Sequence, residues 1–498
     1  MNNRIAEKKT DWYKGFITLE VVIALTILTL MLSATTLISF SNLSVLSDGK
    51  TDREVRGIID ELLAKARASL AYDFKQSVSI AEGSNGIYTT NLDVKTVDYF
   101  IKKLTATVSW TSGFGRTLQI SQTEIVTDYL NTTGGDSCDG EVIGDWASPL
   151  VVNNITDLAT LIGSSTGTYP VTDIDVYRDR LYVTTNNSSR NQETFFIFDV
   201  TDLAHPSLIS KLDNDLVNNT GIKALFVYGD KYETYAYVAN SSSFTKGQLQ
   251  IIKVSDSVPS VISTYKIPTS IVAGSSNQGN GNSIFYKEGY VYLGLTKTVA
   301  GPEFNIIDVH DPFTPIWIGG YAVGNGVNDL FIKDGFAYLV TANDQELITL
   351  DVSNPANPVR VGGFDAPDSV GTGKSLYVVG DTIYLGRTAT ASHPELYLLD
   401  NSNPNTIPAP LGTREIGSSV NGIIARGDLL LLTTTSGQVQ ILDIASTSSI
   451  TNKTPPLILP NSGSGVGLDC ERNEIFVAST PNSGIFAGKG AISILTAK

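Results

Sequence analysis

The sequence has few of the residues that build cofactor and metal sites. Its 498 residues include 2 cysteines and 3 histidines, so we expect neither a disulfide framework nor a zinc site of repeated Cys and His ligands. It also lacks a P-loop, a Gly-rich dinucleotide fingerprint and an EF-hand loop. The histidines, His205, His310 and His393, have no Cys, Ser or Asp at a spacing typical of catalysis. These absences predict a protein without cofactor, metal or enzymatic activity, although a catalytic cluster assembled from distant segments stays open.

Positive charge is also in deficit. The chain has 35 Lys and Arg against 50 Asp and Glu, a formal net charge of −15, with no basic block beyond its first residues. This balance argues against nucleic acid as a partner. The 42% hydrophobic and 17% charged content is typical of a folded protein. Helix-forming residues become scarce after residue 80 while Tyr, Gly, Ser, Thr and Asn are plentiful, so most of the chain is predicted to be β.

The N-terminal region has a polar leader and a long apolar run. Residues 1–15 have a net charge of +2, and residues 16–40 contain Glu20 as their only charge. As a helix, this run would span roughly 37 Å at about 1.5 Å per residue, enough to cross a bilayer. The positive leader predicts a cytoplasmic N-terminus. A secretory signal peptide would have a shorter apolar core, and a simple signal anchor remains an alternative.

A second helical pattern follows the apolar run. Between Val55 and Leu70 the apolar residues recur at i, i+3, i+4 and i+7, which predicts an amphipathic helix. We expect one helix over 16–78, spanning the membrane over 16–40, with its weak point near Gly49.

The order of Gly15, Phe16, Glu20 and the long apolar run resembles the N-terminal signal of type IV prepilins and type II secretion pseudopilins. The resemblance implies that a prepilin peptidase cuts between Gly15 and Phe16 and N-methylates Phe16. Glu20 would then face the positive amino terminus of a neighbouring subunit, a pairing that makes a buried carboxylate tolerable. It also implies a single-pass location in the cytoplasmic membrane before assembly, and a pilus or cell-surface location afterwards.

Residues 79–130 are predicted to form a small sheet. Apolar and polar residues alternate on both sides of Ser112-Gly113-Phe114-Gly115, which indicates a β-hairpin. This segment is similar to the head of minor pilins and pseudopilins, and we expect the amphipathic helix to pack on it. Residues 131–145 are rich in Gly, Asp, Ser and Thr and indicate a linker.

The remainder of the chain repeats one apolar strand seven times, at spacings of 45 to 55 residues. The central large residues of these strands are Tyr182, Tyr237, Tyr292, Tyr338, Tyr384, Leu431 and Phe476. A second strand follows each one and often ends in Asp, which we expect to accept backbone N–H bonds in the following turn. The pattern predicts a seven-bladed β-propeller over 146–498, and an array of β-sandwiches is the alternative.

The segment "LITLDVSNPANPVRVGGF" (347–364) resembles the LVIVD-repeat family of propellers. The resemblance covers roughly 170–498 and implies the propeller fold without a particular ligand. The predicted fold class is thus an α+β pilin-like region, with a long membrane-spanning helix and a small antiparallel sheet, followed by an all-β seven-bladed propeller.

The seventh unit has three strands before Lys498, so we expect residues 157–164 to supply its outer strand and close the ring. Closure would bring the linker close to blade seven. We therefore predict a disulfide between Cys138 and Cys470, formed outside the cytoplasm, with two unpaired thiols as the alternative.

Polar residues precede the repeated strands by nine or ten positions, where they could surround one mouth of the central channel. The candidate binding residues are Asp173, Asn282, Asn328, Asp329, Lys374 and Asn421. Polar residues at strand starts are often only turn formers, so a structural role is the alternative.

Together these features predict a minor pilin-like subunit of a type IV pilus that displays a propeller for adhesion or partner recognition. Its expected partners are the prepilin peptidase, other pilin subunits, the membrane, and a surface, glycan or protein ligand. A type II secretion pseudopilin that contacts cargo, or a membrane-anchored surface enzyme, is the alternative.

Overall fold

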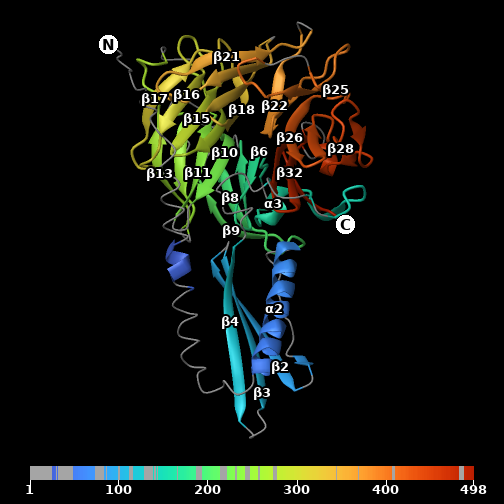
Figure 1. Ribbon diagram of the computed structural model, residues 1–498. Helices are drawn as coiled ribbons and strands as arrows, with labels where there is room; N and C mark the ends of the chain where they lie inside the picture. The colour runs from blue at the N-terminus through green and yellow to red at the C-terminus, as the bar shows by residue number, and fades with distance from the viewer. Residues whose placement is uncertain are drawn as a thin grey trace, which may run out of the picture. The chain divides into compact units, whose positions relative to one another are not determined.

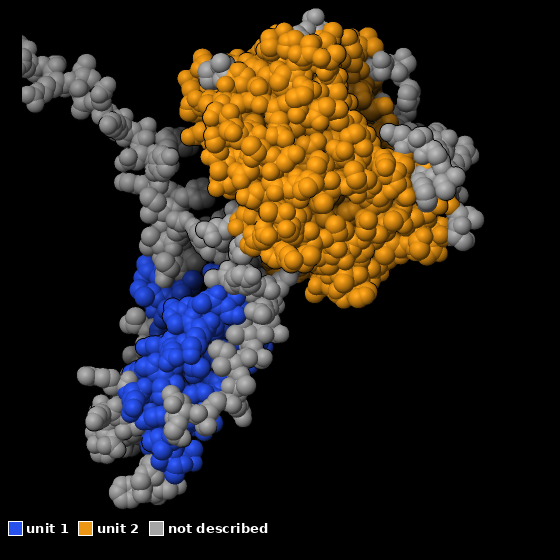
Figure 2. Space-filling view, turned by 90° about the vertical axis from the view of Figure 1, so that its right-hand side faces the viewer, with its two compact units in different colours: residues 1–128 blue, residues 129–498 orange. Residues whose placement is uncertain are grey.

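A computed structural model describes the chain as two compact units, residues 1–128 and 129–498 (Figure 2). The described residues are 25–29, 31, 49–72, 83–85, 87–98, 101–111, 116–127, 138, 142, 144–164, 167–186, 193–213, 221–229, 233–241, 247–255, 258–272, 278–343, 345–367, 370–406, 410–481 and 487–498.

In the first unit, helix α2 (Gly49–Tyr72) packs on a four-stranded antiparallel sheet (Figure 1). The strands are, in spatial order, β1 (Gly83–Asn85), β2 (Tyr88–Asp98), β3 (Ile101–Thr111) and β4 (Thr117–Thr127). Apolar residues at helical spacing on α2, such as Ile59 and Leu63, meet alternate residues of β3, such as Leu104. The predicted packing of helix on sheet is confirmed, as is the pairing of the two strands that flank residues 112–115.

The predicted fold class is wrong in its first element. The helix that covers the sheet begins at Gly49, and among the described residues no helix is long and apolar enough to cross a membrane. Helix α2 has charged residues on its exposed face, including an ion pair of 2.7 Å between Lys65 and Glu61. Its apolar face packs on the sheet. The predictions of one helix over 16–78 and of a single-pass membrane location are therefore wrong.

The residues that carry the pilin resemblance cannot be placed. Gly15, Phe16 and Glu20 lie outside the described residues, and of the apolar run only residues 25–29 and 31 are described, all helical and exposed.

The second unit contains seven antiparallel sheets among its described residues, and each has four or five strands. The first strand of each sheet lies beside that of the next, and the ring closes where β31 meets β6. The predicted β-propeller is confirmed. Blades 1 to 4 are β6 (Val171–Val176), β7 (Arg180–Thr185), β8 (Phe195–Asp199) and β9 (Ser207–Leu212); β10 (Ile222–Gly229), β11 (Thr234–Asn240), β12 (Leu249–Lys253) and β13 (Ser260–Tyr265); β14 (Gly281–Lys287), β15 (Tyr290–Leu295), β16 (Phe304–Asp308) and β17 (Ile316–Tyr321); β18 (Val327–Lys333), β19 (Phe336–Thr341), β20 (Leu347–Asp351) and β21 (Val359–Phe364). Blades 5 to 7 are β22 (Gly373–Val379), β23 (Thr382–Arg387), β24 (Leu396–Asp400) and β25 (Gly412–Arg414); β26 (Val420–Arg426), β27 (Leu429–Thr434), β28 (Gln438–Asp443), β29 (Thr451–Asn452) and β30 (Leu457–Ile458); β31 (Ser464–Glu471), β32 (Glu474–Thr480), β33 (Ala491–Thr496) and β5 (Leu150–Ile155).

Blade 7 is completed by an early segment of the chain, as expected, but not by the predicted one. Strand β5 (Leu150–Ile155) pairs antiparallel with β33, while residues 157–164 contain the short helix α3 (Leu158–Leu161). Asp157 caps this helix by accepting the N–H of Ala159 at 3.0 Å. The β-branched residues of "LVVNNI" favour the strand. Asp157 follows this strand and caps the start of the helix, so residues 157–164 do not continue the strand.

The Asp at the end of the third strand has the structural role that its position predicts. In five blades one carboxylate oxygen accepts the backbone N–H two residues later, over 2.8 to 3.1 Å. These residues are Asp199, Asp308, Asp351, Asp400 and Asp443.

Candidate functional site

The first strands of all seven blades line a central cavity of about 490 Å³. Each of these strands contains a β-bulge near its start, because pairing with the second strand skips one residue there. A bulge re-aims the side chain of the extra residue. We call the bulge residues and those directly after them the polar layer. Its members are Thr172, Asp173, Lys223, Ala224, Asn282, Ser283, Asn328, Asp329, Lys374, Ser375, Asn421, Gly422, Val466 and Gly467.

All six candidate binding residues lie in the polar layer, but most of them bond to the neighbouring blade. The Nδ2 atoms of Asn282, Asn328 and Asn421 donate to the carbonyl oxygens of Val327, Gly373 and Gly465, at 2.8, 2.7 and 2.8 Å. The hydroxyl of Thr172 makes the same contact with Ile222 at 2.7 Å. Each acceptor is on the first strand of the next blade. The bulge side chains therefore link consecutive blades around the channel, and their role in binding stays a prediction.

Asp173 and Asp329 link blades through their carboxylates. Asp329 accepts the N–H of Leu376 in the next blade and that of Leu330 beside it, both at 2.9 Å. Asp173 accepts the N–H groups of Leu225 and Ile174 in the same way. Burial raises the pKa of each carboxyl to about 7, and the charge of Asp329 adds to the effect on Asp173. Both line the cavity, yet protein surrounds them.

Lys374 differs from the other candidates. It is half-buried in the polar layer and, among the described residues, has no hydrogen-bond or ion-pair partner. Lys223, at the equivalent position of blade 2, is exposed, and its charge lowers the pKa of Asp173 against the dominant effect of burial. Two lysines and two aspartates thus give the polar layer a formal charge of zero.

A second layer lies two residues further along each first strand, directly opposite the central residue of the repeated strand. We call it the aromatic layer. Its members are Asp175, Phe226, Phe285, Phe331, Tyr377, Ile424 and Asp469. The four aromatic rings follow one another from blade 2 to blade 5, with centroids 4.8, 5.0 and 5.4 Å apart. Sequence reasoning missed this layer, although the alignment of repeats that located the anchor residues also aligns these positions.

A further set of buried polar residues stands directly before the third strand of four blades. Each accepts a backbone N–H from the segment that leads to the next blade. These residues are Gln248, Glu303, Glu346 and Glu395. A Glu or Gln directly before an apolar strand recurs in four units of the sequence, and this recurrence could have predicted a buried structural role for these residues.

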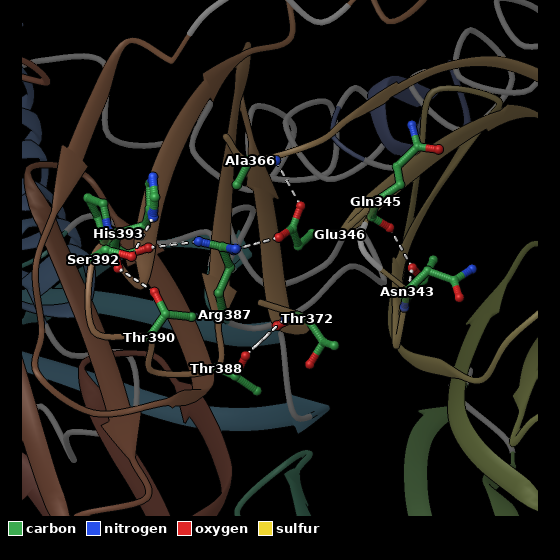
Figure 3. Close-up of polar contacts among 12 residues, drawn as sticks. Asn343, Gln345, Glu346, Ala366, Thr372, Arg387, Thr388, Thr390, Ser392 and His393 are labelled. Atoms are coloured by element: carbon green, nitrogen blue, oxygen red, sulfur yellow. Dashed lines mark hydrogen bonds and ion pairs between the residues drawn. The ribbon is translucent and has the colours of Figure 1, made fainter. Parts of the chain in front are cut away.

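Glu346 also forms a fully buried ion pair between blades 4 and 5 (Figure 3). Its Oε1 lies 2.6 Å from Nη2 and 2.8 Å from Nε of Arg387, and its Oε2 accepts the N–H of Ala366 at 2.9 Å. Burial raises the pKa of Glu346, and Ala366 and Arg387 oppose that shift. The pair fixes the segment that precedes β22, close to Lys374.

The histidines remain apart from these layers. His205 and His310 are exposed and bond to Asp202 and Asp308 of their own turns, at 3.0 and 2.8 Å. His393 contacts Ser392 in the segment before β24 (Figure 3). Among the described residues, no group of three or more His, Cys, Asp or Glu could hold a metal ion.

A disulfide joins Cys138 to Cys470, with their Cα atoms 5.3 Å apart. It connects a residue that precedes the propeller to the first strand of blade 7. Asp145 and Lys498 also exchange two backbone hydrogen bonds, of 3.0 and 3.2 Å, next to that blade. Blade 7 is therefore closed by a strand, a backbone pair and a covalent bond.

Solved structures are similar to this chain at low sequence identity. A comparison with curated protein sequences gives no match. Raptor from Chaetomium thermophilum aligns with a TM-score of 0.51 and 13% identity, over 73% of this chain and only 29% of the Raptor chain. The WD40 repeats of RRP9 align with a TM-score of 0.49 and 8% identity, over 71% and 99% of the two chains. The periplasmic gluconolactonase PpgL of Pseudomonas aeruginosa aligns with a TM-score of 0.47 and 12% identity, over 58% and 85%.

One repeat is matched at the level of sequence. Residues 325–366, which comprise blade 4, match the LVIVD repeat. The chain is therefore a β-propeller protein that contains an LVIVD repeat.

Proposed function

We propose that the chain is a non-enzymatic recognition protein whose propeller binds a partner through its central channel. The observation that supports this proposal is the aromatic layer, because Phe226, Phe285 and Phe331 are only half-buried and line a cavity of about 490 Å³. Concave sites of this size that combine aromatic and polar side chains are typical of ligand binding. The polar layer adds Lys223 and Lys374, which line the same cavity.

A channel-blocking variant tests this proposal in the full-length protein. Ala224 lines the cavity and packs at the edge of the core between blades 2 and 3, so Ala224→Arg narrows the channel. The urea-unfolding midpoint of this variant is measured first, and the comparison is made with the folded variant. Ser260→Arg, on the exposed outer strand of the same blade, is the matched control. We expect cells that produce Ala224→Arg to lose adhesion or partner retention, while the control behaves as wild type. Equal adhesion by both variants would rule out recognition through the channel.

We also propose that the N-terminal region delivers the propeller to a pilus, as a minor pilin-like subunit. The order of Gly15, Phe16 and Glu20, and a helix that packs on a small sheet, support this proposal. A type II secretion pseudopilin has the same features and remains the second candidate. The proposed partners are a prepilin peptidase and other pilin subunits.

Mass spectrometry of the mature N-terminus tests the pilin proposal. Protein from cells that contain a prepilin peptidase should begin at N-methylated Phe16, and Gly15→Lys should abolish this product. An uncut leader in wild-type protein would contradict it. If the leader is cut, the two candidates are separated by where the chain is found. A pilus subunit should copurify with type IV pili and do so after deletion of the secretion system, whereas a pseudopilin should copurify with the secretion complex and do so after deletion of the pilus genes.

A further inference from the structure

We infer that the aromatic layer binds an organic cation, an alkylammonium or guanidinium group, between its four rings and its two carboxylates. This inference rests on the proposed function, because it names the chemistry of the ligand that the channel recognises.

The rings form a continuous surface on one side of the channel. Phe285 is in contact with Phe226 and Phe331, and Tyr377 extends the row into blade 5. All four line the cavity, and the three phenylalanines are partly accessible from it. Aromatic faces attract cations through their quadrupole, more strongly where water is excluded.

The carboxylates of the same layer belong to blades 7 and 1, which are neighbours in the ring. Asp469 accepts the N–H of Val176, and Asp175 accepts the N–H of Val227 at 2.8 Å. Asp469 also lies 3.8 Å from the Sγ atom of Cys138 through its other oxygen. Both carboxylates line the cavity, and the order of the seven blades places blades 7 and 1 opposite blades 3 to 5.

The charge balance of the two layers gives the selectivity. In the polar layer, Lys223 and Lys374 lie in the same cavity as Asp173 and Asp329, whose pKa values of about 7 leave them only partly ionised at neutral pH, so this layer does not by itself attract a cation. The aromatic layer holds two carboxylates and no cation. An amine or guanidinium that passes the polar layer would meet rings and negative charge together, whereas a neutral or anionic group would lose the carboxylate interaction.

Two sources of such a cation are possible: a free amine, or a Lys or Arg side chain of a partner. The affinity of the full-length protein is measured for three ligands: n-butylammonium, pentan-1-ol and the peptide acetyl-Gly-Lys-Gly-amide. Each ligand is titrated at constant ionic strength, and its binding is monitored by ligand-detected NMR. We expect both cations to bind and the neutral alcohol to bind at least about tenfold more weakly. Tighter binding of the peptide would indicate a partner side chain, and tighter binding of the amine a free ligand.

Two independent variants and one control complete the test. The double variant Phe285→Leu/Phe331→Leu and the single variant Asp469→Asn should each weaken n-butylammonium binding at least about tenfold. Phe313→Leu, at an aromatic residue that is 58% exposed outside the channel, should leave it unchanged. Equal binding of alcohol and amine, no binding to the wild type, or unchanged binding in both folded variants would overturn the inference.

The two proposals can fail separately. If Ala224→Arg abolishes partner retention but n-butylammonium does not bind, the channel recognises a partner by other chemistry and the cation inference falls. If the cation binds as expected and Ala224→Arg leaves partner retention unchanged, the cation site stands and recognition of the partner through the channel falls.

Discussion

The polar and aromatic layers lie two residues apart on the same strands, yet their side chains are used differently. In the polar layer, Asn282, Asn328 and Asn421 bond to the backbone of the next blade. In the aromatic layer, Phe226, Phe285 and Phe331 contact one another across blades. Polar groups near a channel are thus engaged by the architecture, whereas the half-buried rings remain accessible to a ligand.

The difference follows from backbone geometry. A β-bulge leaves one carbonyl or N–H of each first strand without its usual ladder partner, and a nearby polar side chain of the preceding blade fills that need. Past the bulge, Asp175 and Asp469 meet the same need in two blades by accepting the N–H groups of Val227 and Val176. The phenylalanine rings at the equivalent positions of blades 2 to 4 have no hydrogen-bonding group. The need to pair these backbone groups therefore explains the polar side chains of the polar layer, whereas the phenylalanine rings of the aromatic layer call for another explanation.

The largest expected effect is a fall in stability with rising pH. The carboxyls of Asp173 and Asp329 have pKa values of about 7 in the folded protein, against an ordinary value of 3.8. Between these values the folded state binds more protons than the unfolded state, so the free energy of unfolding decreases as pH rises. We expect a loss of roughly 3 to 5 kcal/mol between pH 5 and pH 8, measured by urea unfolding.

The double variant Asp173→Asn/Asp329→Asn should flatten this dependence. Asp351→Asn is the control, because hydrogen bonds from Ser353 lower the pKa of Asp351 and it is ionised throughout this range. A wild-type protein whose stability does not change between pH 5 and pH 8 would show that both polar-layer carboxylates titrate normally.

Next in size is the loss of the buried ion pair. Arg387→Met leaves Glu346 without its cation, and we expect a cost of about 3 to 5 kcal/mol in the free energy of unfolding. Arg360→Met is a matched control, because Arg360 is exposed and, within the described part of the chain, bonds only to the side chain of Gln345. We expect the control to cost about 1 kcal/mol or less. Similar unfolding midpoints for the two variants would mean that the buried pair is not an organising contact.

Third is the removal of the asparagine links. Asn282→Ala/Asn328→Ala/Asn421→Ala removes one hydrogen bond between blades at Asn282 and at Asn328 and two at Asn421. At about 1 kcal/mol for each position, we expect a total cost of about 3 kcal/mol. Lys374→Ala, at the same layer and without a partner among the described residues, should change stability by less than about 0.5 kcal/mol. If the triple variant unfolds at the wild-type urea concentration, these residues are available for ligand binding after all.

The sequence allowed the propeller to be predicted because its signals are periodic. Tyr338 and its six equivalents mark the second strand of each blade. Asp351 and its equivalents mark the turn that follows the third strand. The amphipathic pattern from Val55 to Leu70 was likewise sufficient to predict the packing of α2 on its sheet. These features depend on neighbours that lie close in sequence or that recur at one spacing.

Other features depend on contacts that no spacing reveals. The bond of Asn328 to the carbonyl of Gly373 in the next blade is one of them, and the predicted role of Asn328 in binding stays a prediction. The choice between β5 and residues 157–164 as the closing strand depends on a cap by Asp157. The length of the first helix was overestimated because an apolar run and an amphipathic pattern were joined across Gly49.

The smallest expected effect concerns the aromatic layer itself. Phe285→Leu keeps an apolar side chain but removes the ring contacts with Phe226 and Phe331, so we expect a cost of about 1 kcal/mol in the free energy of unfolding. Urea unfolding beside the triple asparagine variant measures this directly. A loss as large as that of the triple variant would make the rings part of the structural frame. A small loss, together with weaker cation binding, would leave ligand recognition as the reason that rings line this part of the channel.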